Sequence, residues 1–137
     1  MTEENRRSNL EAELERGNAS LRAAEALLGL ALWDDAVSRA YYAAFHHVQA
    51  LLFSEGLEAR SHTGTHDLLF QHFVRHGYLP ARLAKLFAGL QRYREQADYS
   101  RLFRFDEQGA REEVERAGEI CRTVRDLLSA RGWLARA

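Results

Sequence analysis

The chain has 137 residues, which suits one domain with a single packed core over residues 1–137. Hydrophobic residues make up 46% and charged residues 28%, a balance typical of soluble globular proteins, and no apolar run approaches the roughly 20 residues that span a bilayer. The formal net charge of −1 excludes a globally basic nucleic-acid-binding surface. The N-terminal residues lack the apolar stretch of a signal peptide, so we expect a cytoplasmic protein without membrane contact.

Five helices are predicted, because apolar residues recur at helical spacing and the sequence contains one proline. The first is expected over residues 5–28, where Gly17 weakens it locally and Gly29 is suited to end it. Asp34 or Asp35 then places negative charge at the positive end of the second helix, which is expected to stop before the next glycine.

The second half continues this pattern with short connections. Ser61 or Thr63 can cap a third helix that ends at Gly77, and Pro80 starts a fourth at a position where its missing N–H costs little. A fifth helix is expected over residues 107–131. Long helices with short connections pack mostly antiparallel, so the predicted fold class is all-α, an up-and-down bundle of four to five helices.

An irregular segment separates the fourth and fifth predicted helices. It contains Leu102, Phe103 and Phe105, which are too apolar to remain in solvent. We therefore expect these three side chains to pack down on the bundle.

The second predicted helix is apolar on two sides, which is unusual for a helix at the surface of a bundle. One side is a core stripe, and on the other Arg39, Tyr42 and His46 share a face with alanines and Phe53. This face is expected to meet a second helix, a second subunit or a substrate. A homodimer that buries more than about 1,000 Å² in total is predicted.

Two interpretations of this polar face remain open from the residues alone. In the first, Arg39 pairs with Asp98 inside the bundle and Tyr42 or Tyr99 completes the network, because a buried arginine without a partner is very costly. In the second, the face is a catalytic or phosphate-binding site. Arg94 and Asp98, four residues apart, are also suited to an ion pair within one helix.

Histidines at four-residue spacing, His62 with His66 and His72 with His76, could place two imidazoles on one metal ion. The neighbouring residues do not supply the third or fourth ligand, so neither a metal nor another cofactor is predicted. His62 has separate interest, because a predicted helix start can bind an anion. Cys121 lies on an apolar stripe and is expected to be a buried core residue.

Four segments carry a resemblance to a known family, in the expected order and over most of the chain. They are residues 24–36, the run SRAYYAAFH at 38–46, SHTG at 61–64 and REQADY at 94–99. Together they resemble the HEPN superfamily, and in particular its small stand-alone bundle proteins.

The resemblance implies a helical bundle that commonly forms dimers. Many members are metal-independent endoribonucleases, and some are toxins whose partner is a minimal nucleotidyltransferase. Nuclease members carry an arginine, four to six residues and then a histidine, and Arg39 and His46 meet this spacing. The chain departs from the pattern at Ala40, where nucleases usually carry a small polar residue or histidine, and at Val48, where members silenced by adenylylation carry tyrosine.

The first functional hypothesis is an RNA-cleaving toxin or related RNA-processing factor, in which His46 transfers protons and Arg39 holds the phosphate. The alternative is a non-catalytic module that presents a nucleotide or RNA to a nucleotidyltransferase, and a purely structural bundle is a third hypothesis. The residues expected to bind substrate or support the pair are Tyr42, His62, Arg94, Asp98 and Tyr99.

Overall fold

A computed structural model describes residues 1–99, 102 and 104–134, and their regular structure is helical, which confirms the all-α prediction. A turn of π-helix at Phe70–Val74 continues the third helix, which therefore reaches the expected end with a local widening. The four long helices and the short one are α1 (Glu3–Gly29), α2 (Trp33–Ser54), α3 (His62–Leu69), α4 (Ala81–Tyr99) and α5 (Glu107–Ala130).

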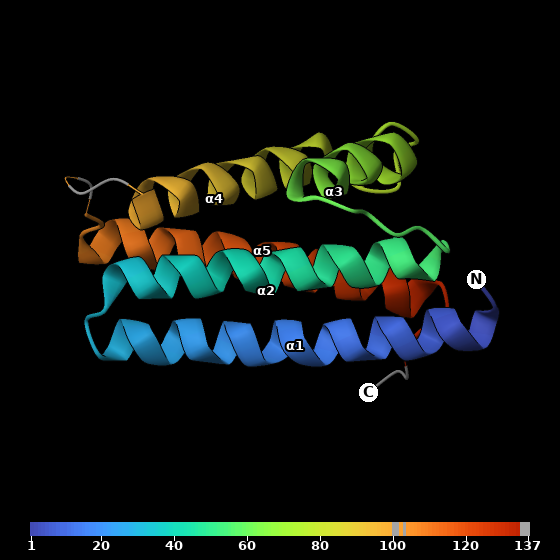
Figure 1. The fold of residues 1–137 in the computed structure, drawn as a ribbon, viewed down its shortest axis with the longest axis horizontal. Helices are drawn as coiled ribbons and strands as arrows, with labels where there is room; N and C mark the ends of the chain where they lie inside the picture. Colours follow the sequence, from blue (N-terminus) through green and yellow to red (C-terminus); the bar gives the residue numbers. More distant parts are fainter. Residues whose placement is uncertain (100–101, 103, 135–137) are drawn as a thin grey trace.

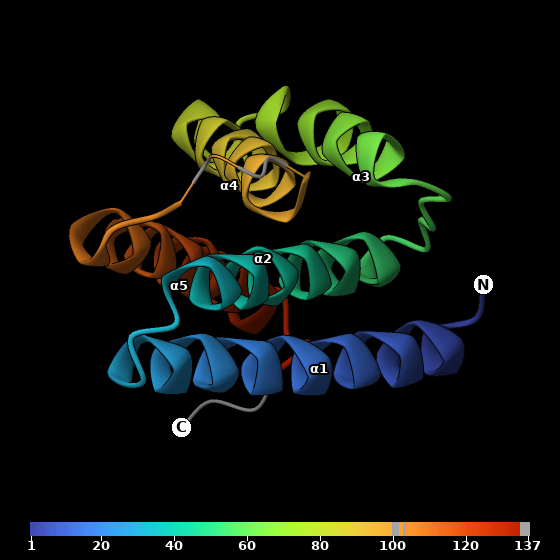
Figure 2. The same cartoon turned by 60° about the vertical axis from the view of Figure 1, so that its left-hand side comes forward.

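Helix α2 is the central element of the bundle. It lies between α1 on one side and α4 and α5 on the other, and α3 packs over its second half (Figures 1 and 2). The side of α2 that carries Ala43 and His47 is buried, and Gly17 of α1 lies against both. The adjoining side, which carries Val37 and Leu51, belongs to the main hydrophobic core. The core side of α2 and the side towards α1 are thus covered within one chain, whereas the predicted polar side with Arg39, Tyr42 and His46 is only partly covered.

The structure explains why glycine occupies position 17 in the middle of a helix, which the sequence alone does not show. It is buried in the contact between α1 and α2, and a Cβ at this position would overlap the imidazole of His47. The Nδ1 atom of His47 lies 2.8 Å from the carbonyl oxygen of Ala43, one helical turn earlier. Glycine therefore permits a buried histidine at this contact, at the cost of lower intrinsic helix propensity.

Several predicted helix ends are confirmed and one is corrected. The Ser61 hydroxyl accepts a hydrogen bond from the Gly64 N–H and caps α3, and Gly77 has the positive φ of 80° expected at a helix end. At the end of α1, however, the left-handed residue is Ala31, with φ of 59°, and not Gly29. The chain needs this conformation two residues later than predicted, in order to turn directly into α2.

The segment before α5 is only in part as expected. Phe105 is half-buried and its ring lies 5.9 Å from that of Tyr93, so it packs on the bundle as predicted. Leu102 is 96% exposed, and the expectation that it packs down is wrong. Phe103 lies outside the described residues. Cys121 is buried as predicted, and burial raises the pKa of its thiol to about 12.

Candidate functional site

Arg39, Tyr42 and His46 form an open face of α2 between the side covered by α1 and the core side. Arg39 is exposed, and its guanidinium carbon lies 5.9 Å from the centre of the Tyr42 ring. The ring of His46 lies 6.4 Å from that of Tyr42. The structure thus brings the predicted arginine and histidine to one surface, with a half-buried tyrosine in contact with both. We call this surface the α2 face.

His46 has a carboxylate partner that sequence reasoning missed. Its Nδ1 lies 2.6 Å from Oε2 of Glu13 in α1, and both side chains are less than one-fifth exposed. Glu13 follows the buried Leu10 by three residues and precedes the buried Leu14. A glutamate on the border of an apolar stripe is a weak sequence signal, because many such residues simply face solvent.

The Glu13 contact determines which ring nitrogen of His46 is available. A carboxylate accepts hydrogen bonds, so it favours the tautomer in which Nδ1 of His46 carries the proton and donates it. Nε2 then has a free lone pair. Among the described residues Nε2 has no hydrogen-bond partner. It is also not buried, so it reaches solvent. His46 is therefore arranged as a proton acceptor.

Arg94 borders the α2 face from α4. Its guanidinium carbon lies 5.0 Å from the centre of the Tyr41 ring and 5.6 Å from that of Tyr42, and its side chain is only 11% exposed. Its Nη1 donates to Oδ2 of Asp98 at 3.0 Å. The aromatic rings and the carboxylate hold the cation beside the face.

The first interpretation of this face, a buried network between Arg39 and Asp98, is wrong. Arg39 is exposed, Asp98 pairs with Arg94, and within the described part of the chain no ion pair of Arg39 occurs. The four-residue spacing on α4 favours the local pair, whereas Arg39 can remain hydrated on the open side of α2. Tyr99 is 79% exposed and makes no ring contact or hydrogen bond with Tyr42 or His46 among the described residues.

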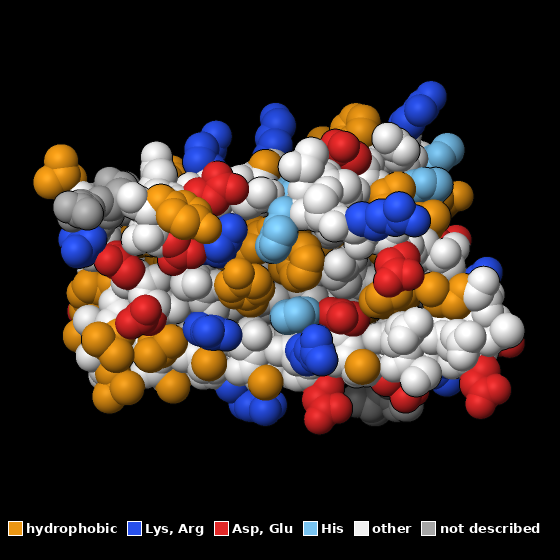
Figure 3. All heavy atoms as spheres, viewed as in Figure 1, with side chains coloured by type: hydrophobic (Ala, Val, Ile, Leu, Met, Phe, Trp, Pro, Cys, Tyr) orange, Lys and Arg blue, Asp and Glu red, His pale blue; other side chains and the backbone are white. Residues whose placement is uncertain are grey.

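His62, at the first position of α3, lies beside the α2 face, against the rings of Tyr41 and Phe45. Its ring stacks on Phe45 at a centre-to-centre distance of 4.6 Å, and its Nδ1 lies 2.6 Å from the hydroxyl of Tyr41. Burial, together with the positive charge of Arg94, lowers the pKa of His62 below its usual value. The structure thus brings His62 to the site as a neutral imidazole. Figure 3 shows histidine and hydrophobic side chains gathered near the middle of the side of the molecule that it draws.

The remaining histidines do not form a metal centre. His66 turns inward and stacks on Phe87 at 3.9 Å, so it does not share a ligand position with His62. His72 and His76 are exposed and line a different hollow, together with Glu55 and Arg131. No group of three or more side chains suited to a metal ion occurs in residues 1–99, 102 and 104–134.

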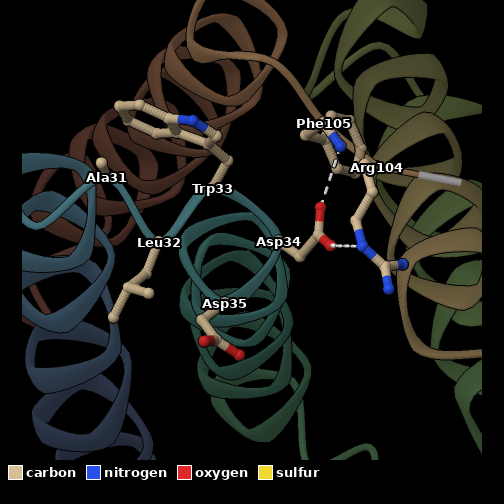
Figure 4. A pocket seen from close by; sticks show the side chains of 7 residues that line it. All are labelled: Ala31, Leu32, Trp33, Asp34, Asp35, Arg104 and Phe105. Atoms are coloured by element: carbon tan, nitrogen blue, oxygen red, sulfur yellow. Dashed lines mark hydrogen bonds and ion pairs between the residues drawn. The ribbon is translucent and has the colours of Figure 1, made fainter.

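A cavity of about 340 Å³ lies at one end of the bundle, at the turn between α1 and α2. Figure 4 shows that Asp34 points across it, accepting a hydrogen bond from the Phe105 N–H at 2.9 Å and facing Arg104. Asp34 thus joins α2 to the segment before α5, besides lying in the first turn of α2 as predicted. The cavity is lined by other residues than the α2 face, which is an open surface.

Comparison with known proteins identifies the family. Residues 10–127 match the HEPN domain family, and the chain belongs to this family. A UPF0332 protein of Gloeobacter violaceus is 38% identical over 86 residues, which are 63% of this chain and 68% of the relative. A protein of Methanocaldococcus jannaschii that carries the name "Putative toxin" is 34% identical over 94 residues, which are 69% of this chain and 70% of that relative.

A solved structure confirms the fold. The crystal structure of TT1696 from Thermus thermophilus superimposes with a TM-score of 0.75, covers 87% of this chain and 98% of that chain, and is 24% identical in sequence. At this identity the likeness establishes the shared architecture alone. None of the helices in the described part of the chain combines the length and apolarity that crossing a membrane requires.

Proposed function

We propose that this HEPN protein is a metal-independent endoribonuclease in which His46 and Arg39 act on the RNA phosphate. The observation that carries the proposal is the Glu13–His46 hydrogen bond of 2.6 Å, which leaves Nε2 open to solvent on the face that Arg39 shares. A histidine with one nitrogen held by a carboxylate and the other free is the arrangement of a general base.

The chemistry follows from these two side chains. Nε2 of His46 takes the proton of the ribose 2′-hydroxyl, and the 2′-oxygen forms a bond to phosphorus while the bond to the 5′-oxygen breaks. The leaving 5′-oxygen takes a proton from water, and the resulting hydroxide recovers the proton held by His46. Arg39 stabilises the negative charge that develops on the phosphate oxygens. The products carry 2′,3′-cyclic phosphate and 5′-hydroxyl ends.

We propose further that two chains form this site together, in a homodimer across the α2 face. The single chain presents Arg39 and His46 on an open surface, and a second copy would exclude water from them. The toxin role and a minimal nucleotidyltransferase as partner belong to the same proposal, supported by family membership and by the toxin name of a relative. Light scattering at micromolar concentration should give twice the monomer mass, and a monomer would remove the shared site.

The experiment is an RNA cleavage assay with purified protein in EDTA. Cleavage should persist, spare DNA of the same sequence, and yield cyclic phosphate ends. His46→Ala should lower the rate by about 10²–10⁴-fold, as expected for a positioned acid or base. Arg39→Ala should cost a similar factor. His72→Ala is the matched control, since His72 is exposed outside the α2 face. Equal cleavage by wild type and His46→Ala would refute the proposal.

A second candidate function is RNA or nucleotide binding without cleavage. Ala40, which follows Arg39, is fully buried and has no polar side chain. Nuclease members usually carry a small polar residue or histidine at this position, so the α2 face lacks a polar group that they have. In this case the same assay gives binding without products, and His46→Ala leaves the affinity unchanged while Arg39→Ala weakens it.

A further inference from the structure

We propose that His62, beside the α2 face, is a third substrate-contacting residue, which donates a hydrogen bond from Nε2 to an oxygen of the RNA phosphate. The inference rests on the proposed function, because it assigns a role at the same site. It adds to the arginine–histidine pair a neutral donor that comes from a different helix, α3.

The first step is the hydroxyl of Tyr41, a residue that is fully buried. Its hydrogen-bond partner among the described residues is Nδ1 of His62, at 2.6 Å. A buried hydroxyl that donates to nothing is costly, so the Tyr41 O–H donates to Nδ1 of His62. Burial also raises the pKa of Tyr41 well above its usual value, so the phenol keeps the proton that it donates. The neutral imidazole of His62 then carries its own proton on Nε2.

The second step is access to solvent. The Nε2 atoms of His47 and His66 are buried and unpartnered, which closes both to a substrate. Nε2 of His62, by contrast, is not buried, and it has no hydrogen-bond partner in the described part of the chain. His62 thus presents an N–H group to solvent with its acceptor nitrogen already occupied, which makes the exposed edge of the ring a donor only.

The third step is the relation between His62 and His46. Both rings contact Phe45, at centre-to-centre distances of 4.6 Å and 5.7 Å. Glu13 makes Nε2 of His46 an acceptor, whereas Tyr41 makes Nε2 of His62 a donor. RNA transesterification needs an acceptor for the 2′-hydroxyl proton and donors to the phosphate oxygens at the same time. The two histidines supply these opposite functions from one chain, and Arg94 adds positive charge beside His62.

Variants of His62 and Tyr41 test the proposal. His62→Ala should lower kcat by about 10²-fold, the usual loss when one preorganised donor to a transition state is removed. His62→Gln should restore part of the rate, because its amide also offers N–H groups. Tyr41→Phe should lower kcat less, since Tyr41 is a positioning residue. Its distinguishing readout is the ¹⁵N NMR spectrum of His62, in which the proton should be on Nε2 in the wild type and shared between both nitrogens in Tyr41→Phe.

A binding experiment separates this proposal from the proposed function. An RNA oligonucleotide with 2′-O-methyl groups, which cannot be cleaved, should shift the Nε2–H signal of His62 on titration and leave that of the exposed His72 unchanged. If the wild type cleaves no RNA but the shift occurs, the nuclease function is refuted and the His62 contact stands. If His62→Ala folds and cleaves at the wild-type rate, or if the proton of wild-type His62 is on Nδ1, the His62 proposal is overturned.

Discussion

His46 and His47 are neighbours in the chain, yet they occupy opposite environments. His46 lies on the α2 face, with Glu13 on Nδ1 and with Nε2 open to solvent. His47 is fully buried against Gly17, bonded to the Ala43 carbonyl, and its Nε2 has no partner. The same side chain is therefore arranged for proton transfer in one case and for close helix packing in the other. A histidine near a motif is informative only once the partner of each ring nitrogen is known.

The first prediction has the largest expected effect and concerns Glu13. Glu13→Gln should lower kcat for RNA cleavage by about 10²-fold or more, because an amide no longer enforces the tautomer that leaves Nε2 of His46 free. Single-turnover cleavage at neutral pH measures the loss. Glu11→Gln, an exposed change on the same helix, and His47→Leu should both cleave at the wild-type rate. A large loss of cleavage rate in His47→Leu, at unchanged stability, would contradict the view that only His46 takes part in the reaction.

The second prediction concerns stability against pH. Burial lowers the pKa of His47 to about 4, below the ordinary 6.5 that it has in the unfolded chain. Between these values the unfolded state binds more protons, so the free energy of unfolding falls as the pH falls, by up to about 3 kcal/mol for this group. Urea denaturation at a series of pH values from neutral down to the lowered pKa measures the slope.

The matched variant for the pH series is His47→Leu, which should flatten the slope between pH 6.5 and about 4. His62 and His66 also have lowered pKa values from burial and leave a residual slope of the same sign. A variant with the full wild-type slope would show that His47 is hydrated in solution.

The third prediction concerns the close contact of α1 and α2. Gly17→Ala should lower the free energy of unfolding by about 1–3 kcal/mol, the usual cost of overpacking, because the added Cβ overlaps His47. At Gly89, where a Cβ meets open space in α4, the change to Ala should instead be neutral or stabilising through higher helix propensity. Thermal melts of the two variants make the comparison, and a stabilised Gly17→Ala would contradict the packing described.

The fourth prediction has the smallest effect and concerns Asp98. Its partner is Arg94 within one helix and its side chain is 37% exposed, so Asp98→Ala should cost less than about 1 kcal/mol. A cost of about 3–5 kcal/mol is what a buried pair with Arg39 would give. Chemical denaturation distinguishes the two values, and the larger one would restore the buried network that the structure rules out.

Short-range patterns in the sequence determined the helices and one face of α2. Apolar spacing, the Ser61 cap and Gly77 act within a few residues, so helix positions follow from local hydrogen bonding and steric preference. The seven-residue separation of Arg39 and His46 places both on one side of a helix whatever surrounds it. Membership in the HEPN family, which the quoted segments indicated, is confirmed by the match over residues 10–127.

Only the tertiary structure decided which partners these side chains have. Glu13 lies 33 residues from His46, and Tyr41 lies 21 residues from His62, so both hydrogen bonds depend on how α1 and α3 pack on α2. The broad burial of α2 also depends on packing, because a central helix contacts several other helices within one chain. Helical periodicity specifies which residues share a face, whereas the relative placement of helices depends on the packing of whole side-chain surfaces.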